Sequence, residues 1–539
     1  MVLNKQEYNC PVTSLLDVIQ LFESEITVLH MKYHLILLTA IILLGFLLRF
    51  VAVSNNPPGL YIDEASIGYN AYTILTTGKD EYGKSYPLWF QSFGDYKMPV
   101  YIYSVSAAMS FLGKTEFAIR FPSVLTGTLT ILVFYLFLQK ILSIETDKKI
   151  REKLKYLPLL ASFLLAISSW HIHFSRGGFE ITEGTLFFLL GCYLYILFVE
   201  GKKLPFTIMS IFFFILAIYT YHTFRILSPL ALFYIIYDQK IYKNSKSLSL
   251  ILGTIILLLP IMLFSLSSNG SERFFATSAF SQIATTNLWQ KLTLYPLIYI
   301  NNYLSFFSFD FLFNFGDGIG RHQIPNFGEL YRWQVPFFLA GIYFLLKQKK
   351  SKIKHATFLL FLSIPIAGAL VVPSPHALRS LPLVIPCIIT VAIGILYIIQ
   401  NLHRFRTILI AIIGIIAIYE FSFYLHFYYI HYPKVNQLDW GAGYKQLVLT
   451  TAQQKTYKHI VIDNTLELLK FAPVYFHFYE PSLNITMISP SWKKPKSWGN
   501  DSILYIRPYY GQKQNENLIK NIYLTNPNND IFAQLWNGK

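Results

Sequence analysis

Long apolar runs alternate with short polar segments along most of this chain. An apolar run of about 20 residues with few charges is long enough to cross a bilayer as a helix. The pattern therefore predicts an α-helical polytopic membrane protein with about eleven transmembrane helices. The helices are expected over residues 35–53, 121–139, 157–173, 183–199, 205–221, 226–238, 249–266, 335–346, 356–372, 382–400 and 406–425.

The composition agrees with a membrane protein and explains the charge. Of the 539 residues, 54% are hydrophobic and 14% are charged, yet the formal net charge is +16. Lys and Arg gather in short loops between the apolar runs, as in 140–155 and 347–354. We interpret this charge as the positive-inside signal of cytoplasmic loops and not as a nucleic-acid surface. The expected location is the plasma (inner) membrane, with a cytoplasmic N-terminus and an outside C-terminus.

The N-terminal residues 1–34 are predicted to be a cytoplasmic segment. They carry Glu7, Asp17, Glu23 and Glu25 and lack the uninterrupted apolar core of a signal peptide. Two interpretations remain open: translation starts at Met31, or the segment forms a short amphipathic helix on the membrane surface.

Two long outer loops, 54–119 and 267–334, interrupt the membrane domain, which is expected to span 35–430. Residues 99–112 begin with Pro99 and are too short to cross comfortably, so they predict an amphipathic helix in the outer interface. The glycines and Pro325 of 314–334 predict an ordered non-helical loop.

The last part of the chain, 431–539, changes to an α/β pattern. Residues 459–463 and 502–510 are typical of strands, and 465–479 of an amphipathic helix. This region contains no cysteine, so its fold must depend on an apolar core. We expect a small C-terminal extracytoplasmic α/β domain.

Two adjacent carboxylates, Asp63 and Glu64, follow the first apolar run in the stretch GLYIDEASIGYNAY. An acidic side chain at the membrane edge costs much free energy if it faces lipid, and little if it faces a water-filled cavity. The pair therefore predicts a functional site at the outer mouth of the helix bundle. Asp95 lies in FGDYKMP and either joins this site or only pairs with Lys97.

Basic residues recur where the predicted helices reach the outer surface. A guanidinium binds phosphate through two parallel hydrogen bonds, although each such residue alone is more often an interfacial anchor than a ligand. Together, opposite a carboxylate pair, they predict a receptor for an anionic headgroup. The pairs are His222 with Arg225, Arg321 with His322, and His376 with Arg379.

Several motifs together resemble a known superfamily. The chain is similar to the GT-C polytopic glycosyltransferases over about residues 35–430, in particular to the family-39-like bacterial members. These are relatives of the protein O-mannosyltransferases and the lipid A aminoarabinose transferases. The motifs are YIDEASIGYNAY, YKMP, RFPSVLTGTLTILVFYLF, FSRGGFE and HALRSLP.

The resemblance implies transfer of a sugar from a polyprenyl-phosphate carrier to an acceptor on the outer face. It places Asp63 at the reaction centre, with Glu64 as the second residue of the acidic pair. The basic residue before the interfacial helix corresponds to Lys97, although Met98 replaces an expected proline. Arg176 and Glu180 match an Arg followed one turn later by an acidic residue, where relatives often have Asp.

Chemical reasoning assigns a function to each candidate. A single inverting displacement needs a base, here Asp63, and positive charge on the departing phosphate. Asp63 and Glu64 are also the candidate ligands of a divalent metal ion. The expected partners are a polyprenyl-phosphate-linked sugar, membrane lipid and an unknown acceptor (protein, lipid or surface glycan), with no nucleic acid. Candidate phosphate ligands are Lys97, Arg176, Arg225, Arg321, His376 and Arg379, and candidate sugar or acceptor ligands are Asp95, Glu180, His222 and His322.

Two other classes of protein remain open at this point. A transporter or lipid flippase also has many spans, but it usually places its polar residues near mid-membrane. A non-catalytic surface-glycan assembly protein would use the outer domain for binding and would not need the acidic pair. The position of the ionisable residues at the outer rim favours surface chemistry.

Overall fold

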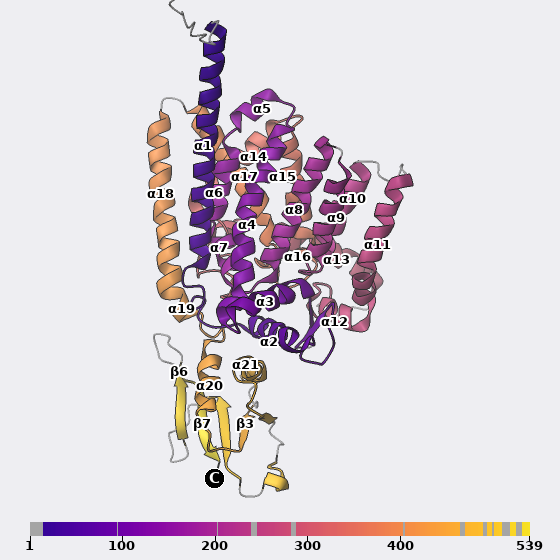
Figure 1. Ribbon diagram of the computed structural model, residues 1–539, viewed down its shortest axis with the longest axis vertical. Helices are drawn as coiled ribbons and strands as arrows, with labels where there is room; N and C mark the ends of the chain where they lie inside the picture. Colours follow the sequence, from indigo (N-terminus) through magenta and orange to yellow (C-terminus); the bar gives the residue numbers. More distant parts are fainter. Residues whose placement is uncertain are drawn as a thin grey trace, which may run out of the picture.

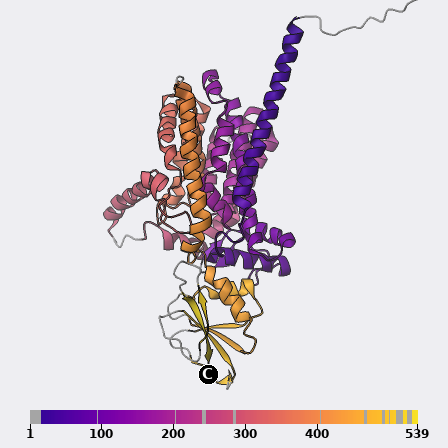
Figure 2. The ribbon, with the colours of Figure 1, turned by 90° about the vertical axis from the view of Figure 1, so that its left-hand side faces the viewer.

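A tall helical bundle with a small sheet at one end makes up the molecule (Figure 1). The long N-terminal helix projects from the end opposite the sheet (Figure 2). The computed structural model describes residues 15–93, 95–201, 203–238, 245–281, 287–402, 405–463, 469–488, 493–498, 501–508, 518–523 and 531–538.

Every apolar run predicted to cross the membrane coincides with a helix or with a bent pair of helices. Among the described residues, five helices are long and apolar enough to span, or up to seven if each bent pair is one span. Others, such as Leu204–Ile218, are shorter apolar helices. The chain is thus a multi-pass membrane protein. The bundle contains α1 (Leu15–Phe50), α4 (Glu116–Ser143), α8 (Glu180–Gly201), α9 (Leu204–Ile218), α10 (Phe224–Asp238), α11 (Ser245–Leu266), α14 (Val335–Lys347), α17 (Val384–Asn401) and α18 (Arg406–His426).

Two predicted spans are broken. The run 157–173 becomes α6 (Leu157–Ala166) and α7 (Ser169–Arg176), bent by 53°. Helix α7 begins after Ser168, because the Ser168 side chain caps it by accepting a hydrogen bond from the His171 N–H. The run 356–372 becomes α15 (Lys352–Ser363) and α16 (Pro365–Ala369), with Pro365 at the first position of the second helix.

A layer of short elements closes the outer end of the bundle. Helices α2 (Ile62–Thr77) and α3 (Pro99–Leu112) lie across this end (Figure 1), and the hairpin β1 (Phe90–Ser92) and β2 (Asp95–Lys97) lies between them in the chain. The helix predicted over 99–112 is confirmed. Residues 59–72, treated as a loop, instead contain most of α2. Its first turn holds the two acidic residues, and it ends at Gly78, whose φ of +70° favours glycine.

The outer loop 267–334 is more helical than predicted. It contains α12 (Ser268–Thr277) and α13 (Leu288–Ser305). Its second half, 314–334, is mainly non-helical as its glycines predict, apart from the last residue of a π-helix (Asp310–Asn314) and a 3-10 turn (Arg332–Gln334).

The C-terminal region is a mixed α/β unit. It consists of α20 (Ala442–Ala452), β3 (His459–Asp463), α21 (Ala472–Tyr479), β4 (Ile485–Ile488), β5 (Ile503–Pro508), β6 (Leu518–Tyr523) and β7 (Ile531–Gly538). The sheet order is β4-β3-β5-β7-β6, with β3 parallel to both neighbours and β7 antiparallel to β5 and β6. Both predicted strands are confirmed. The predicted helix begins later, at Ala472, and residues 464–468 lie outside the described residues.

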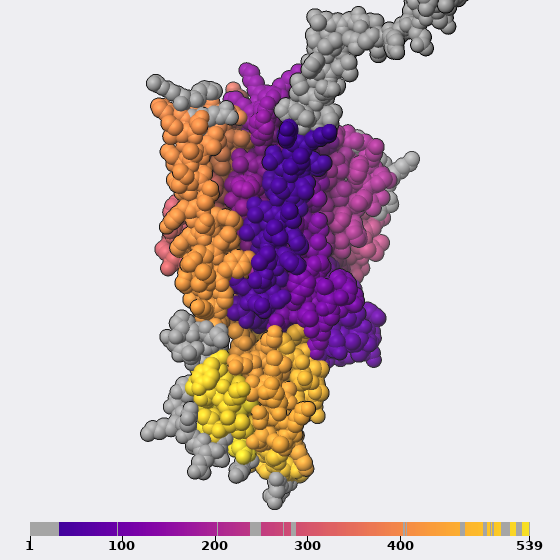
Figure 3. Space-filling view, turned by 60° about the vertical axis from the view of Figure 1, so that its left-hand side comes forward, coloured from indigo at the N-terminus to yellow at the C-terminus, as the bar shows by residue number. Residues whose placement is uncertain are grey.

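The C-terminal region packs directly on the outer layer (Figure 3). The Tyr475 hydroxyl donates to the Leu60 carbonyl at 2.9 Å, just before α2. Lys445 and Tyr479 both contact the carboxylate of Glu116, at the start of α4. These contacts place α21 next to α2, the helix that carries the acidic pair.

Candidate active site at the outer end of the bundle

Asp63 faces a cavity and holds a buried lysine. Lys97 Nζ lies 2.5 Å from Asp63 Oδ1, and 41% of the Asp63 side chain is exposed compared with 7% for Lys97. Burial lowers the pKa of Lys97, but the carboxylates of Asp63, Glu180 and Asp95 more than offset this effect and hold its pKa above the ordinary value. Lys97 therefore stays charged beside Asp63.

Glu64, the next residue in the first turn of α2, is fully buried. Arg120 binds it with two hydrogen bonds, Nε to Oε1 at 2.8 Å and Nη2 to Oε2 at 3.0 Å. The backbone N–H groups of Gly178 and Tyr61 donate to the same carboxylate at 2.7 and 3.2 Å. Glu64 thus locks the start of α2 to α4. Both Glu64 oxygens already accept hydrogen bonds from these donors, and the suggestion that Asp63 and Glu64 could hold a divalent ion stays a prediction.

Arg120 is fully buried and binds several segments of the chain, and it was not among the predicted site residues. Besides Glu64, its guanidinium donates to the carbonyls of Val53 at 2.7 Å, Pro57 at 3.0 Å and Gly59. All five of its N–H donors therefore have acceptors. The only signal in the sequence was an arginine inside the quoted motif RFPSV.

Arg176 is also buried and bound to the backbone. It donates to the carbonyls of Leu48 at 2.8 Å, Arg49 at 3.3 Å and Asn56 at 2.9 Å, and to the Tyr428 hydroxyl at 3.2 Å. These contacts join α7 to the end of α1. In this structure the Arg176 guanidinium is buried among these acceptors, and its assignment as a donor-phosphate ligand stays a prediction.

The cavity in front of Asp63 has a volume of about 500 Å³. Asp95 and Lys97 from β2 line it, together with Phe93 from the hairpin. Lys470 and Phe471, just before α21, form its other wall, and the rings of Phe93 and Phe471 meet edge to face at 5.4 Å. The C-terminal region therefore contributes to this cavity, which the sequence did not indicate. We call it the outer cavity.

A narrow pocket continues from Asp63 into the bundle. Its volume is about 30 Å³, and Asp63, Lys97, Glu180 and His222 all line it. Glu180 is the first residue of α8, and His222 precedes α10. Two residues predicted to bind sugar thus lie beside the predicted base.

An apolar groove of about 810 Å³ begins on the other side of His222. Side chains of α10, α11, α12 and α16 line it, and Arg225 and Arg379 lie on its wall. Arg225 Nη2 lies 3.0 Å from Met98 Sδ, next to Lys97, and the Arg379 carbonyl accepts a hydrogen bond from Thr223 at 3.0 Å. The groove combines apolar walls with two arginines near the acidic site.

These three spaces share residues. The outer cavity and the narrow pocket both contain Asp63 and Lys97, and the pocket and the groove both contain Tyr221 and His222. The Asp63–Lys97 pair therefore lies between an outer cavity and an apolar groove with arginines. This arrangement suits a reaction that joins one hydrophilic and one lipid-linked partner.

Arg321 approaches the same site from the outer loop. Its guanidinium carbon lies 5.5 Å from the ring centroid of Tyr61, which precedes α2 and lines the narrow pocket. Tyr61 also stacks on Phe179 at 5.2 Å and meets Trp440 edge to face. Arg321, a predicted phosphate ligand, thus lies against an aromatic residue that lines the narrow pocket.

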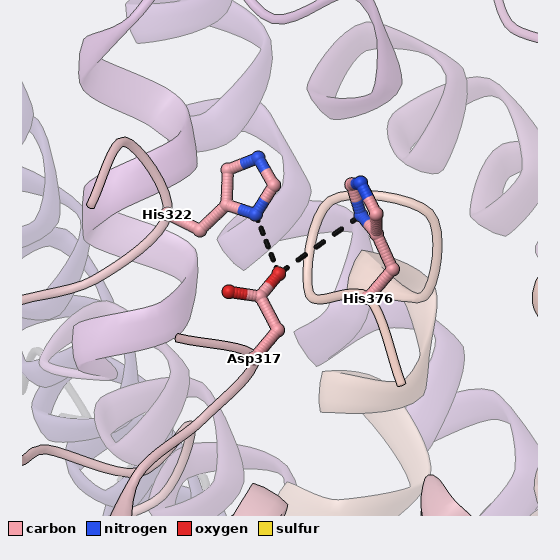
Figure 4. Close-up of side chains that lie close together, drawn as sticks. All are labelled: Asp317, His322 and His376. Carbon is pink, nitrogen blue, oxygen red and sulfur yellow. Dashed lines mark hydrogen bonds and ion pairs between the residues drawn. The ribbon is translucent and has the colours of Figure 1, made fainter. Parts of the chain in front are cut away.

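His322 and His376 belong to a separate buried cluster with Asp317 (Figure 4). His322 Nδ1 lies 2.5 Å and His376 Nδ1 4.0 Å from the same oxygen, Asp317 Oδ2. Both imidazoles contact Asp317, and the assignments of His376 to phosphate and of His322 to sugar stay predictions. Among the described residues, these three side chains form a group that could hold a metal ion.

Comparison with known proteins supports the fold. No protein-family model matches the chain, and no curated protein matches it. Among solved structures, ArnT from Cupriavidus metallidurans bound to undecaprenyl phosphate matches with a TM-score of 0.57, 11% identity, and coverage of 94% of this chain and 98% of that chain. The same protein in the apo state gives a TM-score of 0.53 with 11% identity and the same coverage.

A weaker likeness links the chain to the archaeal oligosaccharyltransferase AglB from Archaeoglobus fulgidus, solved with an inhibitory peptide and a dolichol-phosphate. Here the TM-score is 0.48 with 12% identity, over 83% of this chain and 64% of that chain. ArnT is a lipid A aminoarabinose transferase with the GT-C fold. The match to ArnT shows that this chain shares its fold, and the predicted fold class, an α-helical polytopic membrane protein with a small C-terminal α/β domain, is confirmed.

Proposed function

We propose that this protein is a membrane glycosyltransferase that moves a sugar from a polyprenyl-phosphate carrier to an acceptor hydroxyl. The observation that carries the proposal is the position of Asp63 and Lys97 between the outer cavity and the apolar groove. The ArnT neighbour of the same fold was solved with undecaprenyl phosphate, which supports a donor of this class.

The groove is the proposed binding site for the lipid carrier. Its apolar walls match a polyprenyl chain, and Arg225 and Arg379 match the phosphate because a guanidinium donates two hydrogen bonds to one anion. The sugar then lies at the mouth of the narrow pocket, near Glu180 and His222, because the pocket itself, at about 30 Å³, is too small to hold a sugar ring. The acceptor enters from the outer cavity.

The proposed chemistry is one inverting displacement. The Asp63 carboxylate accepts the proton of the acceptor hydroxyl while that oxygen forms a bond to the anomeric carbon. The bond from the anomeric carbon to the phosphate oxygen breaks, and its electron pair stays on the phosphate. Lys97, Arg225 and Arg379 stabilise this negative charge. Lys97 also orients Asp63 through its ion pair.

The orientation and the domain boundaries belong to the same proposal. Residues 35–430 form the transferase domain and 431–539 an extracytoplasmic domain that forms a wall of the outer cavity. The lysine-rich loops then face the cytoplasm of a plasma (inner) membrane. A topology reporter fused after Lys352 should be active only in the cytoplasm, and one fused at Lys539 only outside. If the Lys352 fusion were active only outside and the Lys539 fusion only in the cytoplasm, Asp63 would lie on the cytoplasmic face and the proposal would fail.

The proposal is tested in cells by mass spectrometry of surface glycans, glycolipids and glycoproteins. Deletion of the gene should remove one sugar, and the wild-type gene should restore it. The Asp63→Asn variant should fail to restore it although the protein is present in the membrane. Asp310→Asn is the matched control, because Asp310 is exposed on the outer loop and contacts Asn314. Restoration by Asp63→Asn at the wild-type level would refute the proposed base.

A further inference from the structure

We propose that Asp317, His322 and His376 bind one zinc ion that joins two outer loops of the protein. Asp317 and His322 belong to the loop between α13 and α14, and His376 to the segment between α16 and α17 (Figure 4). Metal binding at this cluster does not depend on the proposed transferase reaction.

The geometry of the three side chains fits a single small ion. One potential ligand atom from each residue lies within 4.8 Å of the others. The two imidazole rings are 4.7 Å apart between centroids, and both Nδ1 atoms point to Asp317 Oδ2 (Figure 4). Bonds of about 2.0–2.1 Å in a tetrahedral site separate ligand atoms by about 3.3 Å. His322, at 2.5 Å, and His376, at 4.0 Å, each need to move by roughly 1 Å or less to reach this spacing.

Burial and charge support a cation at this position. The exposed fractions of the Asp317, His322 and His376 side chains are 0%, 2% and 9%. A buried carboxylate is costly unless a positive charge compensates it, and its described ion pairs are with these two histidines. A zinc ion would supply that charge with both imidazoles neutral.

The ligand types select the metal. Two imidazole nitrogens and one carboxylate oxygen are a common zinc set, whereas Mg²⁺ and Ca²⁺ prefer oxygen ligands. The carboxylate is also held in place from behind, as metal-binding carboxylates usually are. The Ile319 N–H donates to Oδ1 at 2.9 Å, and the Ala377 N–H donates to Oδ2 at 2.8 Å.

The proposed ion would fix two residues of the active site. Arg321 directly precedes His322 and extends to the ring of Tyr61. Arg379 follows His376 by three residues in a turn, and its backbone N–H lies 3.4 Å from His376 Nδ1. The zinc site is thus a positioning device for Arg321 and Arg379. It does not touch the reacting atoms.

The test measures metal in the purified full-length protein in detergent, without donor or acceptor. After chelation, addition of zinc and removal of free ions, wild type should retain about one zinc per chain by mass spectrometry. His322→Asn and His376→Asn should each retain much less. His431→Asn is the control, because the exposed pair His426 and His431, with Nε2 atoms 3.2 Å apart, is a place where adventitious zinc would bind.

A second measurement, on wild-type protein, tests the proposal even if the histidine variants fail to fold. Zinc should raise the melting temperature of chelated wild-type protein more than Mg²⁺ does, and His431→Asn should behave like wild type. Co²⁺ in place of zinc should give the visible absorption of a tetrahedral site. Folded wild-type protein that retains no zinc overturns the proposal, and so does zinc retained equally by His322→Asn. Neither outcome depends on sugar transfer, so failure of this site is distinct from failure of the proposed function.

Discussion

Asp63 and Glu64 are neighbours in the chain but occupy opposite environments. Both lie in the first turn of α2, where adjacent side chains point about 100° apart. Glu64 is fully buried and holds Arg120, whereas 41% of Asp63 remains exposed in a cavity with Lys97. One carboxylate therefore stabilises the fold, and the other remains accessible to a substrate.

The comparison shows how a membrane protein uses acidic residues at its surface. A buried carboxylate must satisfy its oxygens within the protein, and Glu64 does so with four hydrogen bonds from Arg120, Gly178 and Tyr61. An exposed one can exchange partners and protons. The Glu64–Arg120 pair fixes α2, and that rigid helix then holds Asp63 in position.

Removal of the proposed base should have the largest effect. Asp63→Asn preserves size but cannot accept a proton, so kcat should fall by about 10²–10⁴-fold. The melting temperature should also fall, because Lys97 loses its ion-pair partner, but folded protein should still be obtained since Glu180 and Asp95 also stabilise the lysine charge. Asp63→Glu should also be poor, because an extra methylene moves the carboxylate by roughly 1 Å. A transfer assay on purified protein with a lipid-linked sugar measures both. Normal transfer activity in Asp63→Asn would show that Asp63 is not the base. The proposed difference in function between Asp63 and Glu64 would then be refuted.

Disruption of the buried pair should affect stability instead. Glu64→Gln leaves the Arg120 charge uncompensated, and loss of one partner of a buried pair costs about 3–5 kcal/mol. Thermal unfolding in detergent, or the yield of folded protein, checks this prediction. Asp501→Asn is the control, because Asp501 is 32% exposed and its partner Lys458 69% exposed, and such a surface pair contributes much less to stability. Equal melting temperatures for wild type and Glu64→Gln would contradict the structural function of Glu64.

Loss of a groove arginine should weaken donor binding more than acceptor binding. Arg379→Ala removes a charged hydrogen-bonding group worth about 1.5–3 kcal/mol, which corresponds to a rise of about 10–100-fold in the donor KM. Arg379→Lys should recover only part of the loss, since lysine lacks the planar fork. Arg332→Ala is a control on the same side of the bundle, where Arg332 is exposed. A donor KM that is unchanged in Arg379→Ala would make Arg379 an interfacial anchor.

The smallest expected effect is a pH dependence of stability at Lys97. Because its folded-state pKa is raised, the stability that its charge contributes is complete below the unfolded-state pKa of about 10.4. This contribution disappears as the pH rises through the folded-state pKa. The difference in melting temperature between wild type and Lys97→Met should therefore shrink above about pH 10.4 and stay constant below it. A difference that grows with pH would mean that Asp63 does not stabilise the lysine charge.

The helices of the bundle were predictable because lipid imposes a simple rule on each segment separately. A run such as 382–400 must satisfy its own backbone hydrogen bonds, so apolar length alone indicates a helix, observed as Val384–Asn401. Helix α2 was not predicted. Its apolar side is formed by small residues such as Ala65 and Ala71, which are buried by contact with other elements and not by a strong periodic pattern.

The sequence by itself determined the class of fold, the acidic pair and the candidate phosphate-binding arginines, because each is a local property of residue type and spacing. Only the tertiary structure decided which carboxylate is buried, since that depends on Arg120, 56 residues away along the chain. The same holds for Arg176, which meets backbone carbonyls of α1, and for His376, which meets Asp317 across two loops. Burial and pairing depend on contacts between distant segments, and spacing along the chain does not specify them.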